Sequence, residues 1–190
     1  RFSKTMWPLA WYGIRKANMG LENLDKMVEA TDEQRNLIEG QLYFFRAWFH
    51  FELMQYFGGL PYVDVIPSSS EPLRLPRLSY QACADRAAED FRRAADLLPI
   101  DWDDTDTGKA TFGNNQLRIN IMALAYLGKN YLWAGSPLMN YESQGKKTYN
   151  TEYCKKAADI FAEVLNLVEE GKTQYALVDF KNYSDIFYSW

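Results

Sequence analysis

EGQLYFFRAWFHFELMQYFGGLPY, residues 39–62, is the stretch of sequence that decides the fold. Its first part belongs to a predicted helix, 33–57, that is apolar on almost every side, which is typical of a helix covered by several neighbours. The apolar residues are Leu42, Phe44, Phe45, Trp48, Phe49, Phe51, Leu53, Met54, Tyr56 and Phe57. Gly58 and Gly59 predict the end of this helix, and Pro61 predicts an extended exit. We therefore expect a buried central helix that turns sharply into an irregular segment.

Helical periodicity on both sides of this central helix predicts an all-α fold. Gly13 and Gly20 lie one heptad apart in the first helix, and we expect a neighbouring helix to approach closely there. Prolines and a run of serines predict that 58–78 is irregular, and 99–113 is expected to be a second long loop. The other predicted helices are 8–30, 80–98 with Ser79 as its cap, 114–134, one that Thr151 caps and Gly171 follows, and a short one from Tyr183.

A weak internal repeat indicates how these helices pair. The segment RRAADLL, 92–98, parallels KKAADIF, 155–161, and each lies in an alanine-rich helix that follows a large aromatic helix. Alanines allow one helix to nest against a bulky partner, as in tetratricopeptide (TPR) arrays. The sequence therefore predicts TPR-like helix pairs joined by long irregular loops.

Length and composition exclude several classes of function. The 190 residues suit one domain or one lobe of a larger one, and a net charge of −4 argues against nucleic acid as a partner. Arg46, His50 and Glu52 interrupt the central helix, so it is not expected to cross a bilayer. Two cysteines, Cys83 and Cys154, are too few for a disulfide framework and are interpreted as small buried hydrophobes.

Few residues have the types and spacing that catalysis or metal binding requires. His50 is the one histidine, and on an aromatic helix it is interpreted as a packed, hydrogen-bonded core residue. Arg46 is interpreted as a structural cation that must be paired. The sequence has no phosphate loop or dinucleotide fingerprint, and no cofactor is expected. A weak calcium candidate is the acidic run Asp101, Asp103, Asp104 and Asp106, for which a solvated acidic loop is the favoured alternative.

Aromatic side chains near loops give the better indication of function. Tryptophan rings stack on the apolar faces of sugars, while neighbouring polar groups bind the hydroxyls. Trp7, Trp11 and Trp102 are therefore the candidate ligand-binding residues. The alternative for each of the three is an ordinary packing anchor.

Several motifs, in order along the chain, resemble those of the SusD/RagB family of surface glycan-binding lipoproteins of Bacteroidota. They are Trp7 with Tyr12-Gly13-Ile14, Phe45-Arg46-Ala47, Gly58-Gly59-Leu60-Pro61-Tyr62, Asp90 with Ala94-Ala95 and Leu97-Leu98-Pro99, Gly108-Lys109-Ala110-Thr111, and Ala134-Gly135-Ser136-Pro137-Leu138-Met139-Asn140. The resemblance implies that residues 1–190 are the TPR-like lobe of a larger protein. A signal peptide, a lipidated cysteine and a first helix would then precede this chain, and a second lobe would follow it.

The resemblance also implies a function. A SusD-like protein binds an oligosaccharide without chemistry, at the outer membrane, and acts as a lid on a SusC-like TonB-dependent transporter. Such a protein would meet the membrane only through its N-terminal lipid anchor. Three alternatives stay open: an all-helical glycan-active enzyme, a TPR-like scaffold for protein partners, and uptake of peptide in place of glycan.

Overall fold

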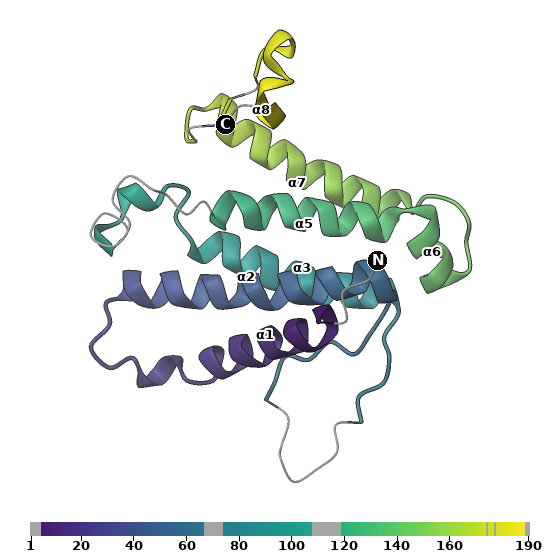
Figure 1. The fold of residues 1–190 in the computed structure, drawn as a ribbon, viewed down its shortest axis with the longest axis horizontal. Coiled ribbons are helices and arrows are strands. Elements are labelled where there is room, and N and C mark those ends of the chain that lie inside the picture. The colour runs from purple at the N-terminus through teal and green to yellow at the C-terminus, as the bar shows by residue number, and fades with distance from the viewer. Residues whose placement is uncertain (1–4, 67–73, 108–118, 174, 177, 189–190) are drawn as a thin grey trace.

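The computed structural model describes residues 5–66, 74–107, 119–173, 175–176 and 178–188, and within these ranges all regular structure is helical (Figure 1). The α-helices are α1 (Met6–Leu21), α2 (Asp32–Phe57), α3 (Tyr80–Leu97), α5 (Ile119–Gly135), α6 (Pro137–Gln144), α7 (Thr151–Glu169) and α8 (Asp185–Tyr188). Short 3-10 helices lie at Leu24–Lys26, Trp102–Asp104 and Phe180–Asn182. The all-α prediction is confirmed. The 108–113 motif and residues 114–118 of a predicted helix lie outside the described residues.

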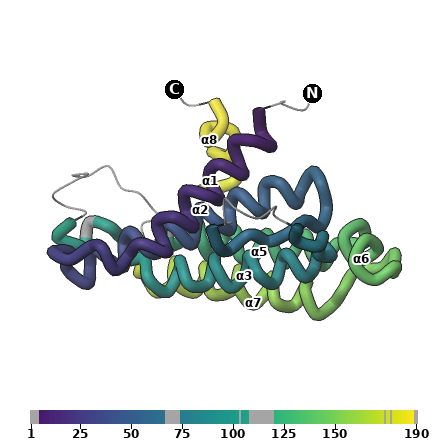
Figure 2. Tube along the Cα trace, turned by 90° about the horizontal axis from the view of Figure 1, so that it is seen from below, coloured from purple at the N-terminus to yellow at the C-terminus, as the bar shows by residue number. Residues whose placement is uncertain are grey.

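The helices pack in the pairs that the repeat predicts. α2 packs against α3 and α5 against α7, and α3 and α5 join the two pairs. α1 adds a further helix against α2. Figure 2 shows α1 and α2 toward one side of the molecule and α3 and α7 toward the other, as expected for stacked helical pairs.

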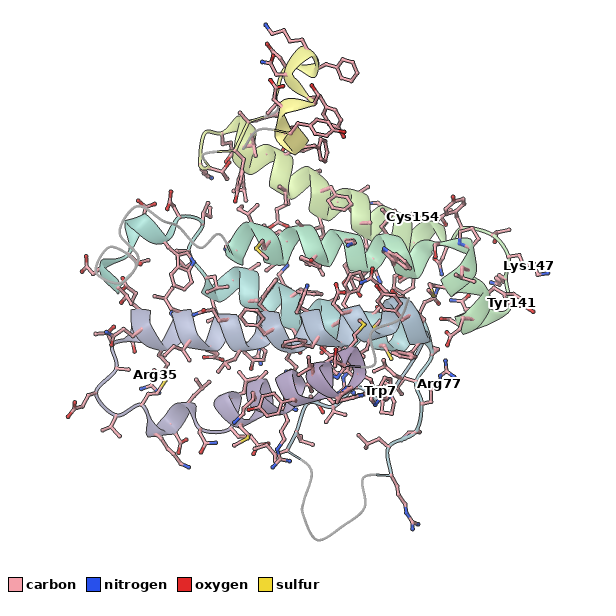
Figure 3. The ribbon with its side chains drawn as sticks, viewed as in Figure 1. Trp7, Arg35, Arg77, Tyr141, Lys147 and Cys154 are labelled. Atoms are coloured by element: carbon pink, nitrogen blue, oxygen red, sulfur yellow. The ribbon has the colours of Figure 1, made fainter. Side chains whose placement is uncertain are left out.

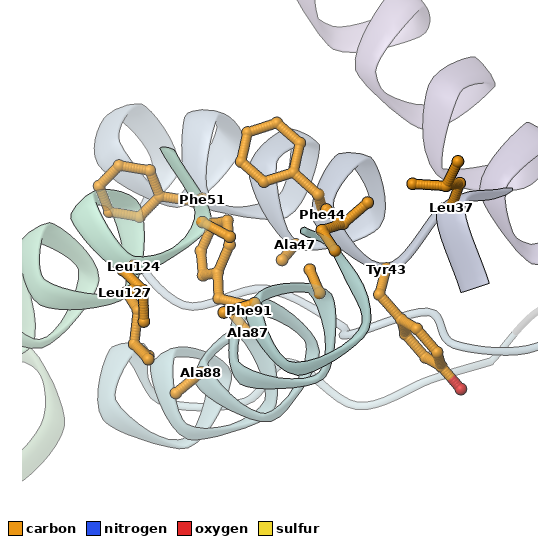
Figure 4. Close-up of a cluster of buried hydrophobic side chains, with 14 of the residues drawn as sticks. Leu37, Tyr43, Phe44, Ala47, Phe51, Ala87, Ala88, Phe91, Leu124 and Leu127 are labelled. Carbon is orange, nitrogen blue, oxygen red and sulfur yellow. The ribbon is translucent and has the colours of Figure 1, made fainter. Parts of the chain in front are cut away.

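Close approach between helices occurs where small residues face large ones. A Cβ atom at Gly13 would lie 2.2 Å from the ring of Phe49, and one at Gly20 would lie 2.6 Å from Leu42, so both glycines let α1 lie directly on α2. On the other side of α2, Phe44, Phe51 and the alanines of α3 fill the core (Figure 4). The small residues of α3 thus have the role that the sequence predicts.

The central helix is less completely covered than expected. Phe45 is 40% exposed and Tyr56 is 60% exposed, while Phe44 and Phe51 are buried. The central helix therefore has several neighbours, as expected, but some of its aromatic residues stay exposed. α1, α3 and α5 all pack against α2, and α3 and α1 do so most extensively.

Capping residues explain where the helices begin and end. Thr31 and Gln34 form a capping box at the start of α2, and the Ser79 hydroxyl accepts a hydrogen bond from the backbone N–H of Ala82, as predicted for α3. The cap of α7 is Asn150 rather than Thr151, because the side-chain Oδ1 of Asn150 accepts hydrogen bonds from the backbone N–H groups of Glu152 and Tyr153.

Three further boundaries differ from the prediction. α1 ends at Leu21 rather than near residue 30, because the chain turns into the 3-10 helix Leu24–Lys26. Helix α6 was not predicted, although Ser136 and Pro137 are a standard start signal. The last helix begins at Asp185, two residues after the predicted start at Tyr183. In the part of the chain that the structure describes, no helix has the length and apolarity needed to span a bilayer.

Candidate functional site

Two of the three candidate tryptophans lie together in the first turns of α1. The ring centroids of Trp7 and Trp11 are 5.5 Å apart in an edge-on contact, and Trp7 also meets the ring of Phe57 edge-on at 4.7 Å. Trp7 is 43% exposed, and Trp11 is half-buried against the ring of His50. Trp7 thus has an exposed ring on a rigid aromatic base, which we call the Trp7 cluster: Trp7, Trp11 and Phe57.

Polar groups lie beside the Trp7 cluster. The guanidinium of Arg77 donates to the backbone carbonyls of Phe57, at 2.9 Å, and Gly59, at 2.7 Å. Figure 3 shows Arg77 and Trp7 at the same end of the molecule. The Arg77 side chain is 63% exposed and lies 3.7 Å from Glu142. An exposed indole next to exposed charged groups is the combination that sugar binding uses.

Trp102 lies at the other end of α2, away from the Trp7 cluster. Its side chain is 2% exposed and belongs to the hydrophobic core with Leu37 and Leu98. The loop that carries it is held by Glu33 at the start of α2, which accepts from the backbone N–H and the hydroxyl of Thr107. This burial favours the packing role that the sequence left as the alternative for Trp102.

The acidic run beside Trp102 forms no metal cluster in the described part of the chain. Among the described residues, no three His, Cys, Asp or Glu side chains lie where they could hold an ion together. The side chain of Asp103 lies outside what the structure describes, and Asp104 and Asp106 are exposed. Asp101 begins the short turn that leads into the 3-10 helix, and its carbonyl accepts from the N–H of Asp104.

Arg46 is the centre of a buried polar network. Its guanidinium makes two hydrogen bonds to the carboxylate of Asp90, at 2.7 and 2.6 Å, and donates to Asn18 and to the carbonyl of Asp64. The hydroxyl of Tyr62 donates to the same carboxylate at 2.8 Å. Burial acts to lower the pKa of Arg46, but the bonds and charge of Asp90 outweigh it, and the pKa is raised.

This network connects α1, α2, α3 and the segment that follows α2. The side-chain amide of Asn18 donates to the carbonyls of Val63 and Val65, so α1 also holds the extended exit of the central helix. Both oxygens of Asp90 accept hydrogen bonds from Arg46 or Tyr62, so the contacts of this carboxylate are structural ones. The contacts of Arg46 therefore support a structural role for this residue.

A charged cavity of about 720 Å³ opens beside the network. Its lining residues are Arg46, Tyr62, Asp64, Arg86, Glu89, Asp90, Arg92 and Arg93. Two pairs of opposite charges lie within this lining, Arg46 with Asp90 and Arg86 with Asp64. The sequence does not indicate this cavity, because its residues come from α2, α3 and the exit segment and share no motif.

His50 is a buried, neutral core residue, as the sequence predicts. Its side chain is 0% exposed, its Nδ1 lies 2.8 Å from the carbonyl of Arg46, and its Nε2 accepts from the backbone N–H of Val63 at 3.0 Å. The two contacts define a tautomer with the proton on Nδ1. Burial is the main cause that lowers the pKa of His50 from 6.5 to about 3.

The depressed pKa of His50 predicts a pH-dependent stability. The unfolded chain takes up a proton below pH 6.5 and the folded chain does not until about pH 3, so stability is full above 6.5 and falls as the pH decreases. We expect the free energy of unfolding to fall by about 2 kcal/mol between pH 7.5 and pH 5 through this residue. Urea unfolding of the intact protein, compared with His50→Gln, measures the difference. Equal slopes with pH in the two proteins would contradict the assignment.

A second polar cluster holds both ends of the 58–79 connection. The carboxylate of Glu142, in α6, accepts from the backbone N–H of Tyr80 at 2.8 Å and of Gly59 at 3.2 Å. Arg77 holds the other side of Gly59 through its carbonyl. The two ends of the connection therefore meet at α6, next to the Trp7 cluster. Glu142 lies outside every motif used above, and nothing in the sequence indicated its role.

The fold defines a class: stacked TPR-like helix pairs, which here carry an exposed aromatic cluster at the start of α1. A model of SusD-like proteins, described as "Starch-binding associating with outer membrane", matches residues 2–132. The match covers more than half of the chain, and the chain belongs to the SusD-like family. The resemblance to SusD/RagB proteins in the sequence is thereby confirmed.

Known proteins similar to this chain agree with that family. SusD-like protein P2 of Formosa agariphila is 28% identical over 130 residues, which are 68% of this chain and 24% of the relative. A SusD-like protein from Bacteroides fragilis has a similar structure with a TM-score of 0.70 at 22% identity, covering 97% of this chain and 30% of that one. A laminarin-binding SusD-like protein gives a TM-score of 0.67 at 22% identity, covering 97% and 34%.

Proposed function

We propose that the protein is a non-catalytic, glycan-binding lipoprotein at the outer-membrane surface and acts as the lid of a TonB-dependent transporter. The observation that carries this proposal is the SusD-like match over residues 2–132, whose description combines starch binding with the outer membrane. The chain spans about a quarter to a third of the length of its relatives. Residues 1–190 would be the TPR-like lobe, with the lipidated N-terminus and a second lobe in other parts of the protein.

The Trp7 cluster is the part of this chain that we assign to ligand contact. Trp7 offers an exposed indole face, while Trp11 and Phe57 fix its position without covering it. A sugar ring stacked there would find Arg77 and Glu142 as hydrogen-bonding neighbours. The neighbouring structure described as laminarin-binding supports a polysaccharide ligand, and a peptide is the alternative.

The proposal includes that the protein binds its glycan without cleaving it. A glycosidase needs one carboxylate as an acid and a second one at a fixed separation across the scissile bond. Asp90, the most buried carboxylate beside the charged cavity, is committed to Arg46 and Tyr62. The test is mass spectrometry of oligosaccharides incubated with the intact protein: unchanged chain lengths support a binding role, and shortened products would contradict it.

Replacing Trp7 is expected to weaken ligand binding. In the intact protein, Trp7→Ala should lower the affinity for its oligosaccharide by about two- to tenfold, since one aromatic stacking contact contributes roughly 0.5–1.5 kcal/mol. Isothermal titration against starch- and laminarin-type oligosaccharides and against peptides measures the effect and separates the two ligand classes. Tyr149→Ala is the matched control, because Tyr149 is 67% exposed on the loop after α6. Equal affinities of wild type and Trp7→Ala would remove Trp7 from the site.

A further inference from the structure

The charged cavity beside the Arg46 network contains polar groups that the described part of the chain leaves unpaired. Four arginines and three carboxylates line it, so the lining carries a net charge of +1. Its volume of about 720 Å³ is ordinary for a small-molecule site, which usually measures roughly 300–1,000 Å³. The question is which of these charged groups are free to meet a ligand.

Arg93 is the arginine of this lining that has no carboxylate partner among the described residues. Its exposed guanidinium donates one hydrogen bond, to the hydroxyl of Tyr43 at 2.6 Å, and lies 5.0 Å from the centre of the Tyr43 ring. A guanidinium has five N–H donors in a planar fork. Most of the donors of Arg93 are therefore open to a ligand in the cavity.

Glu89 is an unpaired carboxylate in the same lining. A glutamate and an arginine four residues apart on a helix commonly form an ion pair. Here Arg93 extends to Tyr43 of α2 instead, and within the described parts of the chain Glu89 makes no hydrogen bond or ion pair. The cavity thus has free donors and free acceptors about one helical turn apart on α3.

The base of the cavity is held in place by its neighbours. Arg46 and Asp90 are buried and joined by two hydrogen bonds, and the guanidinium of Arg46 lies 5.2 Å from the same Tyr43 ring that Arg93 contacts. At the other end, Arg86 pairs with Asp64 and lies 5.6 Å from the ring of Tyr62. The free groups of Arg93 and Glu89 therefore lie beside a fixed, hydrogen-bonded wall.

The free groups match a ligand that has one carboxylate and several hydroxyls. The planar fork of a guanidinium binds a carboxylate through two parallel hydrogen bonds. Hydroxyl groups donate to carboxylates, so they suit Glu89, whereas a second dense anion such as phosphate would be repelled by it. A hexuronate, which is a sugar ring with a carboxylate, combines both kinds of group.

We propose that the charged cavity is a subsite for an acidic sugar, with the carboxylate of a hexuronate residue on Arg93 and its hydroxyls on Glu89. This inference rests on the proposed glycan-binding function and adds a second site to it. The cavity is distinct from the Trp7 cluster, because Phe57 lies eleven residues after Arg46, roughly 16 Å along α2.

Isothermal titration of the intact protein at low salt tests the subsite with a matched pair of ligands, tetragalacturonate and its uncharged methyl ester. We expect the acid to bind at least about tenfold more tightly than the ester. Arg93→Gln should remove about tenfold or more of the affinity for the acid and leave that for the ester unchanged, because a hydrogen bond to a charged group is lost.

Lys16→Gln is the matched control. Lys16 is also an exposed cation over a tyrosine ring, 5.3 Å from the centre of Tyr12, but it lies on α1 outside the lining. Its replacement removes the same charge from the protein and should leave the affinity for the acid unchanged. Equal losses in Arg93→Gln and Lys16→Gln would mean that only the overall charge attracts the ligand, and would overturn the subsite.

Two further arms complete the test. If acetate or a tetraglutamate peptide binds as tightly as tetragalacturonate and with the same dependence on Arg93, the site accepts any carboxylate and the assignment to a sugar is wrong. A neutral laminarin-type oligosaccharide, titrated into the same samples, separates this inference from the proposed function. Binding of the neutral glycan without binding of the acid overturns the subsite alone, whereas binding of neither ligand contradicts both.

Discussion

Replacement of Asp90 by alanine is expected to lower the free energy of unfolding of the intact protein by about 3–5 kcal/mol. The change removes the carboxylate that holds Arg46 through two hydrogen bonds and accepts a third from Tyr62. Both partners then stay buried, with Arg46 at 8% and Tyr62 at 6% exposure, and the guanidinium has no counter-charge at that position. The unfolding midpoint in urea or guanidinium chloride measures the loss.

The chain offers a matched control for this effect. Arg92 and Glu163 also form a doubly bonded ion pair, at 2.9 and 2.7 Å, but their side chains are 35% and 41% exposed. Because water already screens that pair, Glu163→Gln should cost only about 0–1 kcal/mol. A cost for Asp90→Ala as small as that for Glu163→Gln would show that the Arg46 network does not hold the helices together.

Replacement of Gly59 by alanine is expected to destabilise the intact protein by about 3 kcal/mol or more. A Cβ atom at this position would lie 2.0 Å from the carbonyl oxygen of Leu78 and 2.7 Å from the carbonyl carbon of Ser79. These are backbone atoms just before α3. The steric overlap can be removed only if the two ends of the connection move apart. That movement also disturbs the bonds of Gly59 to Glu142 and Arg77.

Gly145 is the control for Gly59, because it tests conformation without a steric contact. Gly145 has φ of +73° at the end of α6, and a Cβ atom there would meet nothing within 4 Å. Gly145→Ala should therefore cost only about 1–2 kcal/mol, which is the penalty of the left-handed region for alanine. Thermal or denaturant unfolding compares the two variants. If Gly59→Ala were no more destabilising than Gly145→Ala, the close contact at Leu78 would not be rigid.

Local patterns in the sequence predicted the helices well. The start of α2 and its end at Gly58 follow from residues that act within one turn of the chain, as does the Ser79 cap of α3. The pairing of α2 with α3 and of α5 with α7 follows from the repeated alanine-rich segments. Helix α6 is harder to predict because it is eight residues long, and its start signal, Ser136-Pro137, lies within a motif that resembles the SusD/RagB family.

Burial was harder to predict than secondary structure, because it depends on which neighbours a side chain meets. Trp102 and Trp7 are both tryptophans near chain turns. Trp102 packs with Leu37 in the core, whereas Trp7 stays 43% exposed. Phe45 and Phe44 are consecutive on the same helix and differ in the same way. Hydrophobicity alone cannot separate such pairs, since apolar atoms also make up much of a protein surface.

The polar contacts that position the site join distant parts of the sequence. Arg46 and Asp90 are 44 residues apart, and each belongs to a separate motif that resembles the SusD/RagB family. Glu142 is 83 residues from Gly59 and belongs to no such motif. A single sequence contains no signal for these pairings, because each partner alone has the character of an ordinary charged residue.

The most direct test of the proposed function is co-purification from the native outer membrane. The intact protein is solubilised gently, captured, and its partners are identified and counted by mass spectrometry. A TonB-dependent transporter recovered in stoichiometric amount is the expected result and would establish the lid role. Recovery of the protein alone, under conditions in which other outer-membrane complexes stay intact, would contradict it and would favour the enzyme or the scaffold.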